Sequence, residues 1–204
     1  AAAASARLGI NTALFTHNKK TIGEMSCNPA IGGLGKGHLV REIDALDGVM
    51  GKAIDQSGIQ FRMLNKSKGP AVHGPRSQAD RSLYKKSVQD ILLSQSKISV
   101  IEGFVDDLII NNKEIKGVVL DNETKIFCNS LIITTGTFLG GKIFVGDKTF
   151  EAGRIGDKSS SKLSKKIREL GFPVGRLKTG TPPRLLKNTI NWDIIELQSA
   201  DQDP

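Results

Sequence analysis

The sequence predicts an α/β fold in which a small antiparallel meander is inserted into a frame of helices and strands. Residues 1–9 have the composition of a helix, and Thr12–Thr16 follows as a short apolar strand, the order found in the second half of a βαβ unit. Between residues 98 and 130 the apolar period changes to two, as expected for a meander. We expect residues 1–204 to belong to one domain that begins inside an element.

The elements of the frame follow from composition and periodicity. Alanine is the best helix former and Gly9 fits a helix end, so residues 1–9 are predicted to be the last turns of a helix. A second helix is predicted before Gly48, because apolar residues recur there at helical spacing: Leu39, Val40, Ile43 and Leu46. Residues 59–63 alternate as a strand. Residues 80–95 have a helical pattern, and these side chains are expected to face the core: Leu83, Val88, Ile91 and Leu92.

The meander is predicted to contain strands at residues 98–101, 108–110, 116–120 and 125–128, with turns at 111–112 and 121–122. Residues 131–136 are then expected to form a fully apolar strand that ends at Gly136. Open α/β sheets bind ligands at the carboxyl ends of their strands, and Gly136 would let a ligand pass close to the backbone. An ordinary turn between strand and helix is the alternative.

Residues 26–38, Ser-Cys-Asn-Pro-Ala-Ile-Gly-Gly-Leu-Gly-Lys-Gly-His, are a candidate ligand-binding loop. Its glycines free the backbone and leave main-chain amides exposed before a helix. A Walker A loop is excluded, because Ala30 stands at its first glycine position and Gly37 at its hydroxyl position. An anion or flavin-like ligand and a purely structural turn remain as interpretations. Cys27 at the loop entrance could be a nucleophile, activated by amides or by Lys36.

Two further segments could contact phosphate. Residues 153–157 precede three serines, one of which is expected to cap a helix, and Arg154 lies nearby. The segment 175–184 is basic and could act with Lys66, Lys68, Arg76 and Arg81 on phosphates, or form a solvated charged face. With one Trp and one Tyr in the chain, stacking on single-stranded bases is not indicated.

Composition limits the class of protein. The chain has 29 basic and 21 acidic residues, a formal net charge of +8, which suits a polyanionic partner such as RNA. Two cysteines, Cys27 and Cys128, exclude a disulfide framework and favour a reducing cytoplasm. The three histidines lack metal-ligand spacing, so no metal site is predicted. No apolar run reaches the ~18 residues of a membrane span, and we expect a cytoplasmic protein without membrane contact.

Taken together, several strings in one order resemble the MnmG (GidA) family of tRNA wobble-uridine modification enzymes. The matching strings are residues 26–38, 55–65, 68–72, 135–139, 153–157 and 176–184, and the likeness runs from Ala1 to about Asn191. The resemblance implies a Rossmann-like FAD-binding domain of the two-dinucleotide-binding flavoprotein type, with the meander as an insertion at about 98–130. It also implies a fragment truncated at both ends, because the family's first strand and βα turn should precede Ala1.

The activity implied by the resemblance is modification at C5 of uridine 34 of tRNA. FAD would be the cofactor, and NADH and methylenetetrahydrofolate the co-substrates. The GTPase MnmE would be the protein partner, in a heterotetramer that contains a homodimer of the full-length protein. By position, Cys27 matches the family's catalytic cysteine, whose thiolate would add to uracil C6 and make C5 nucleophilic. Val105 and Ser160 match FAD-contacting positions, and Gly136 joins them on positional grounds.

Two other functions stay open. The related folate-dependent tRNA uridine-54 methyltransferase family shares the fold and the one-carbon donor, although the long glycine-rich string argues against it. A non-catalytic RNA-binding remnant of a decayed gene is the other alternative, in which the positive charge matters and the flavin site is dead. Salt-sensitive tRNA binding without flavin would favour that remnant.

Overall fold

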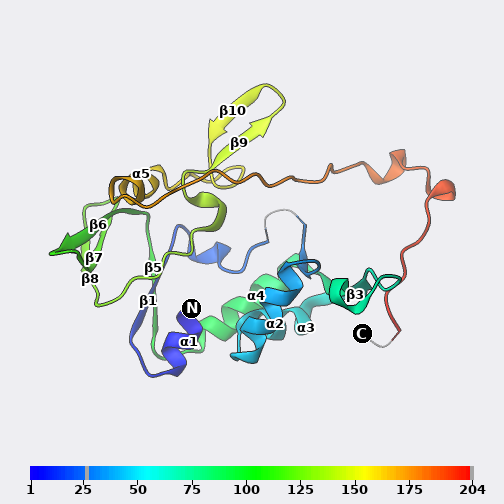
Figure 1. Cartoon of the computed structure of the whole chain (residues 1–204), viewed down its shortest axis with the longest axis horizontal. Coiled ribbons are helices and arrows are strands. Elements are labelled where there is room, and N and C mark those ends of the chain that lie inside the picture. Colours follow the sequence, from blue (N-terminus) through cyan, green and yellow to red (C-terminus); the bar gives the residue numbers. More distant parts are fainter. Residues whose placement is uncertain (26–27, 203–204) are drawn as a thin grey trace. The chain divides into compact units, whose positions relative to one another are not determined.

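The structure, a computed structural model, describes residues 1–25 and 28–202. Two compact units divide the chain (Figure 1). Unit 1 contains Ala1, residues 13–20 and residues 99–178, and unit 2 contains residues 2–12, 21–98 and 179–204. Each unit has its own apolar core. The assignment of residues 1–204 to a single domain stays a prediction.

The strand predicted at Thr12–Thr16 is confirmed as β1, and it pairs with β5 (Ile98–Glu102). The Thr12 N–H donates to the Lys97 carbonyl at one end, and the Gly103 N–H donates to the Thr16 carbonyl at the other, so the strands run parallel. The prediction that residues 98–101 belong to the meander is therefore wrong. The backbone groups of β5 are used by β1, and the long segment between these strands supplies the crossover that parallel pairing requires.

The meander consists of the next three strands: β6 (Val105–Asn111), β7 (Glu114–Leu120) and β8 (Lys125–Phe127). They lie in the order β6-β7-β8, and both pairings are antiparallel. Helix α5 (Ser161–Glu169) packs on this sheet, because Leu163 is buried in one cluster with Leu108, Val118 and Leu120. Burial of these four side chains stabilises unit 1 through the hydrophobic effect.

The strand expected at residues 131–136 is absent from the part of the chain that the structure describes. Ile132 and Ile133 are 63% and 40% exposed there, and the 3-10 helix η3 (Gly136–Phe138) follows. An apolar run becomes a strand only where a neighbour pairs its N–H and C=O groups, and no such ladder is formed here. A hairpin that the sequence did not indicate comes next, formed by β9 (Lys142–Val145) and β10 (Lys148–Glu151).

Unit 2 combines helices with a small antiparallel sheet of order β2-β4-β3. Its helices are α1 (Ala2–Arg7), α2 (Lys36–Ala45), α3 (Val49–Ser57) and α4 (Arg81–Leu93). Its strands are β2 (Ala30–Gly32), β3 (Gly58–Leu64) and β4 (Gly74–Ala79). Four further 3-10 helices lie along the chain: η1 (Lys19–Thr21), η2 (Pro70–Val72), η4 (Lys187–Thr189) and η5 (Trp192–Ile194). Among the described residues, every helix is too short or too polar to cross a membrane.

The core of unit 2 confirms the helix predicted at 80–95 but changes the face it buries. Asp80 caps α4 by accepting the backbone N–H groups of Ser82 and Leu83. Tyr84 is buried and Val88 packs against the same core, while Leu83 is 52% exposed. The expectation that Leu83 faces the core is therefore wrong. The buried face of α4 begins at Tyr84 and recurs every three or four residues, and Leu83, one position earlier, points away from that face.

The last described residues of unit 2 lie along the free edge of β3 (Figure 1). The Asp201 N–H donates to the Phe61 carbonyl, and the Met63 N–H donates to the Asp201 carboxylate at 2.6 Å. The hydrogen bond from Met63 lowers the pKa of Asp201, and the positive charge of Lys66 lowers it further. This segment covers an edge strand that would otherwise present unpaired backbone groups.

Candidate functional site

The predicted nucleophile Cys27 lies outside the described residues, but the glycine-rich loop is described from Asn28 onward. Gly33 donates its N–H to the Pro75 carbonyl and accepts the Gly37 N–H, and the Lys36 N–H donates to the Leu34 carbonyl. The predicted helix does begin at Lys36, as α2. Because three loop amides are already engaged within the chain, these contacts favour the structural-turn interpretation for that part of the loop.

A cluster around His17 brings together elements of unit 1 that are distant in sequence. His17 directly follows β1, and its imidazole stacks on Phe104 with ring centroids 3.8 Å apart. Phe138 meets the same ring edge-on at 5.1 Å. The Ser160 hydroxyl lies 3.4 Å from His17 Nε2, and the Ser160 N–H donates to the Phe138 carbonyl at 2.8 Å. We call these four residues the His17 cluster.

The three residues predicted to contact a cofactor adjoin this cluster. Val105 follows Phe104 at the start of β6, Gly136 begins the 3-10 helix that carries Phe138, and Ser160 is a member of the cluster. The fold of unit 1 therefore collects these residues near the carboxyl end of β1, where open α/β sheets bind ligands. Their role in binding a cofactor stays a prediction.

The backbone at Gly136 is open. It has a φ of 55°, and a Cβ added there would meet no atom within 4 Å. The positive φ explains the glycine, and the open space leaves its backbone accessible to a ligand. The predicted close approach of a cofactor to Gly136 is compatible with this geometry.

Ser160 occupies the N-cap position of α5, as the sequence predicted for one of the three serines. Its side chain, however, makes no capping hydrogen bond to the helix and contacts His17 instead. The expectation that one of the three serines stands at the N-cap is therefore confirmed, but the Ser160 hydroxyl does not cap the helix. With ψ at 62°, the residue lies outside the extended conformation typical of an N-cap, and its hydroxyl is buried beside the imidazole.

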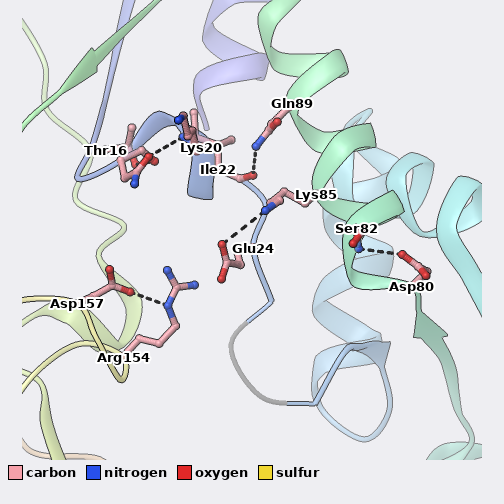
Figure 2. Close-up of polar contacts among 11 residues, drawn as sticks. Thr16, Lys20, Ile22, Glu24, Asp80, Ser82, Lys85, Gln89, Arg154 and Asp157 are labelled. Atoms are coloured by element: carbon pink, nitrogen blue, oxygen red, sulfur yellow. Dashed lines mark hydrogen bonds and ion pairs between the residues drawn. The ribbon is translucent and has the colours of Figure 1, made fainter.

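Arg154, which could have held a pyrophosphate, is engaged with the chain's own carboxylate. Its Nε lies 2.7 Å from the Asp157 carboxylate, as Figure 2 shows. The two residues also form a β-bridge, and their side chains are only 18% and 32% exposed. An ion pair of this kind neutralises the guanidinium, so Arg154 stabilises the turn before α5.

The turn after His17 is fixed by its own polar contacts. Asn18 accepts the Lys20 N–H through its side chain, and the Thr16 hydroxyl donates to the Asn18 carbonyl. The Lys19 N–H donates to the Glu102 carboxylate at the end of β5. These contacts hold the backbone on both sides of the imidazole. Sequence reasoning considered His17 only as a metal ligand, although its place directly after a predicted strand could have identified it.

Burial lowers the pKa of His17 below its ordinary value, and the negative charges of Asp157 and Asp121 oppose that shift in part. The imidazole is therefore neutral at pH 7, and Nε2 can accept a hydrogen bond from Ser160 if the proton is on Nδ1. A neutral ring also stacks on Phe104 without the cost of a buried charge.

We expect the structure around His17 to weaken in mild acid. Stability from a group with a depressed pKa is fully present above the unfolded-state pKa of about 6.5 and is lost as the pH falls toward the lower folded value. Hydrogen exchange at the Ser160 amide, corrected for the intrinsic rate, should accelerate as the pH is lowered from 7.5 to 5.5. The variant His17→Gln should lack this acceleration. Equal pH dependence in both proteins would contradict the assignment.

The parallel pairing of β1 with β5 and the antiparallel meander covered by α5 define a protein of the α/β class. The chain belongs to the family described as Glucose inhibited division protein A, GidA, whose family profile matches residues 1–204. It is 55% identical over 207 aligned residues to the tRNA uridine 5-carboxymethylaminomethyl modification enzyme MnmG of Granulibacter bethesdensis. That alignment covers 100% of this chain and 33% of the relative.

Solved structures show the same similarity. GidA of Aquifex aeolicus in crystal form I matches with a TM-score of 0.91 and 47% identity, over 100% of this chain and 34% of that chain. Crystal form II of the same protein matches with a TM-score of 0.90 and 48% identity, over 98% of this chain and 33% of that chain. The GidA-related protein from Thermus thermophilus shares the fold, with a TM-score of 0.59 and 16% identity. The match covers 84% of this chain and 63% of that chain. The chain spans about a third of the length of MnmG and of Aquifex GidA.

Proposed function

We propose that this chain is the FAD-binding part of an enzyme that modifies C5 of uridine 34 in tRNA. The observation that carries the proposal is the 55% identity along the whole chain to an enzyme whose name states a tRNA uridine 5-carboxymethylaminomethyl modification. Identity at this level over the whole chain supports a shared fold and the same ligands in the shared part. The +8 net charge suits a polyanionic substrate.

The residues near the His17 cluster fit a flavin nucleotide. Gly136 offers open backbone for close approach, and Val105 lies half-buried beside Phe104. The Ser160 hydroxyl and the neutral His17 provide polar groups in a surrounding of aromatic rings. We propose that Val105, Gly136 and Ser160 hold FAD, with Phe104 and Phe138 restricting water at this place. FAD, when bound, would supply electron transfer, with NADH as the reductant.

Cys27 is proposed as the catalytic nucleophile toward the uracil ring. Addition of its thiolate to C6 forms a C–S bond and moves the electrons of the C5–C6 double bond to C5, which becomes nucleophilic. C5 then bonds to the methylene carbon of methylenetetrahydrofolate as one of that carbon's two C–N bonds breaks, and loss of the C5 proton with departure of the thiolate restores the double bond. An amine finally replaces tetrahydrofolate at the methylene carbon, which gives the aminomethyl group and releases tetrahydrofolate. The thiolate leaves unchanged, as a nucleophilic catalyst must.

The proposed assembly extends beyond this chain. We propose that the full-length protein forms a homodimer and works with the GTPase MnmE in a heterotetramer in the cytoplasm. The basis is the family membership of residues 1–204, which make up about a third of the related enzyme's length. Co-purification of the full-length protein with MnmE, followed by mass measurement of the complex, tests this assembly.

The modification itself can be tested by expressing the full-length protein that contains this chain in bacteria lacking their own MnmG. Nucleosides from total tRNA are then separated and identified by mass spectrometry. We expect 5-carboxymethylaminomethyl-type uridine to return at position 34. A new methyl group at uridine 54 would instead indicate the folate-dependent methyltransferase function. Salt-sensitive tRNA binding with neither modification nor flavin would indicate an RNA-binding remnant.

A further inference from the structure

Helix α5 carries basic residues on two faces that differ in their surroundings. On the face toward β6, Lys162 lies 2.5 Å from the Asp106 carboxylate and Lys166 lies 3.0 Å from the Asp107 carboxylate. Lys165 and Arg168, three residues apart and therefore neighbours on the helix surface, line a second groove, and Lys165 also borders the surface that contains Asp106 and Asp107. One face of the helix is thus balanced by acidic partners, whereas the other contributes positive charge to a groove.

This groove in unit 1, which we call the α5 groove, has a volume of about 260 Å³. Its walls carry four basic side chains, from β9, α5 and the segment after α5: Lys142, Lys165, Arg168 and Arg176. Glu151 is the acidic residue among the lining residues, and its carboxylate accepts the Ser161 hydroxyl at 2.8 Å. The groove therefore has an excess of positive charge.

Contacts to backbone carbonyls hold two of these cations in place. Both terminal nitrogens of Arg176 lie 3.3 Å from the Gly140 carbonyl, and Arg168 reaches the Val174 carbonyl at 3.5 Å. Lys165 is 80% exposed, and its ammonium is 3.8 Å from the Glu169 carboxylate, a weak solvent-screened pair. Because Lys142 comes from β9, 23 positions before Lys165 in the sequence, its approach to the cations of α5 is a property of the fold and not of a local charged run.

We propose that the α5 groove binds the phosphodiester backbone of the RNA substrate. The inference rests on the proposed function, which requires a tRNA, and adds the surface that contacts it. Arginine and lysine are the side chains that contact phosphate oxygens, and such contacts fix orientation without reading sequence. Among the described residues that line the groove none is aromatic, so these residues offer no stacking on bases. The groove positions the RNA, and base recognition belongs elsewhere.

The test compares two double charge reversals in the full-length protein. Lys142→Glu with Arg168→Glu changes the groove, and Lys113→Glu with Lys125→Glu makes the same charge change at exposed positions of the meander. Affinity for unmodified tRNA is measured by fluorescence anisotropy between about 50 and 200 mM salt. We expect the groove variant to bind at least about tenfold more weakly, with the slope of log K against log salt reduced by roughly two. The meander variant should change affinity less than about twofold, because it removes no phosphate contact.

Equal weakening in both variants, or none in the groove variant, would overturn the inference. Loss of FAD binding by the groove variant would also overturn it, because the groove would then serve the cofactor's pyrophosphate. If the groove variant unfolds, the neutral pair Lys142→Gln with Arg168→Gln replaces it and should lose affinity in the same direction. Failure of the unaltered protein to bind tRNA would refute the proposed function as well, whereas normal binding by the variants refutes the groove alone.

Discussion

Replacing Cys27 by alanine in the full-length protein is expected to reduce formation of the modified uridine by on the order of 10³-fold or more. A methyl group cannot add to uracil C6, so C5 would lose its activation. Rates are measured as modified nucleoside formed from unmodified tRNA under single-turnover conditions. The flavin content and the thermal unfolding of the variant should match those of the unaltered protein, since the change removes one sulfur atom.

Cys128 provides the matched control for this substitution. It is a free, half-buried cysteine next to β8, and its backbone N–H donates to the Lys116 carbonyl. Cys128→Ala leaves that backbone contact in place and is expected to keep the modification rate within about twofold, as for most substitutions outside a site. A Cys27→Ala protein that still modifies tRNA at a normal rate would refute the nucleophile assignment.

The second large effect is expected from Gly32→Ala, at the end of β2. Gly32 has a φ of 93°, and a Cβ added there would lie 2.1 Å from the Pro75 carbonyl oxygen. That oxygen is backbone of β4 and already accepts the Gly33 N–H, so it cannot move aside without breaking the pairing of β2 and β4. We expect the free energy of opening these strands to fall by ~3 kcal/mol.

Gly35→Ala is the matched control for Gly32→Ala. Gly35 also has a positive φ, 71°, but a Cβ added there would meet no atom within 4 Å. Without that clash, its cost should be limited to the conformational penalty of its backbone, at φ 71° and ψ −61°, of about 1–2 kcal/mol. Native-state hydrogen exchange of the β2 and β4 amides measures both values. Equal destabilisation by the two substitutions would show that the Pro75 contact contributes nothing.

Apolar periodicity correctly predicted the helices and strands whose own residues show a clear pattern. Thr12–Thr16 is a strand as expected, the strand expected at residues 59–63 is β3 (Gly58–Leu64), and α4 begins after its Asp80 cap. The missed elements have weak local patterns. Strand β4, Gly-Pro-Arg-Ser-Gln-Ala, shows little apolar alternation, and backbone pairing with both β2 and β3 makes it a strand. Helix α3 contains a glycine, yet its Ala53 and Ile54 are buried in the core.

The candidate site also contains some residues that the sequence indicated and others that only the structure revealed. Val105, Gly136 and Ser160 were assigned by resemblance to a family, while His17, Phe104 and Phe138 emerged from the structure. Their association could not be predicted from spacing, because the rings come from separate elements and meet only when β1, β6 and η3 are assembled. The hydroxyl of Ser160 illustrates the point, since its position fits a helix cap but its contact is with His17.

The sequence by itself determined the α/β class and most helices and strands, because these follow from local periodicity. It also determined the family, because several matching motifs in one order do not arise by chance. Only the tertiary structure decided that residues 98–102 pair with β1, that residues 131–135 form no strand among those described, and that four cations converge in the α5 groove. The physical reason is that strand pairing and charge clustering depend on neighbours distant in the chain, and such neighbours are set by packing.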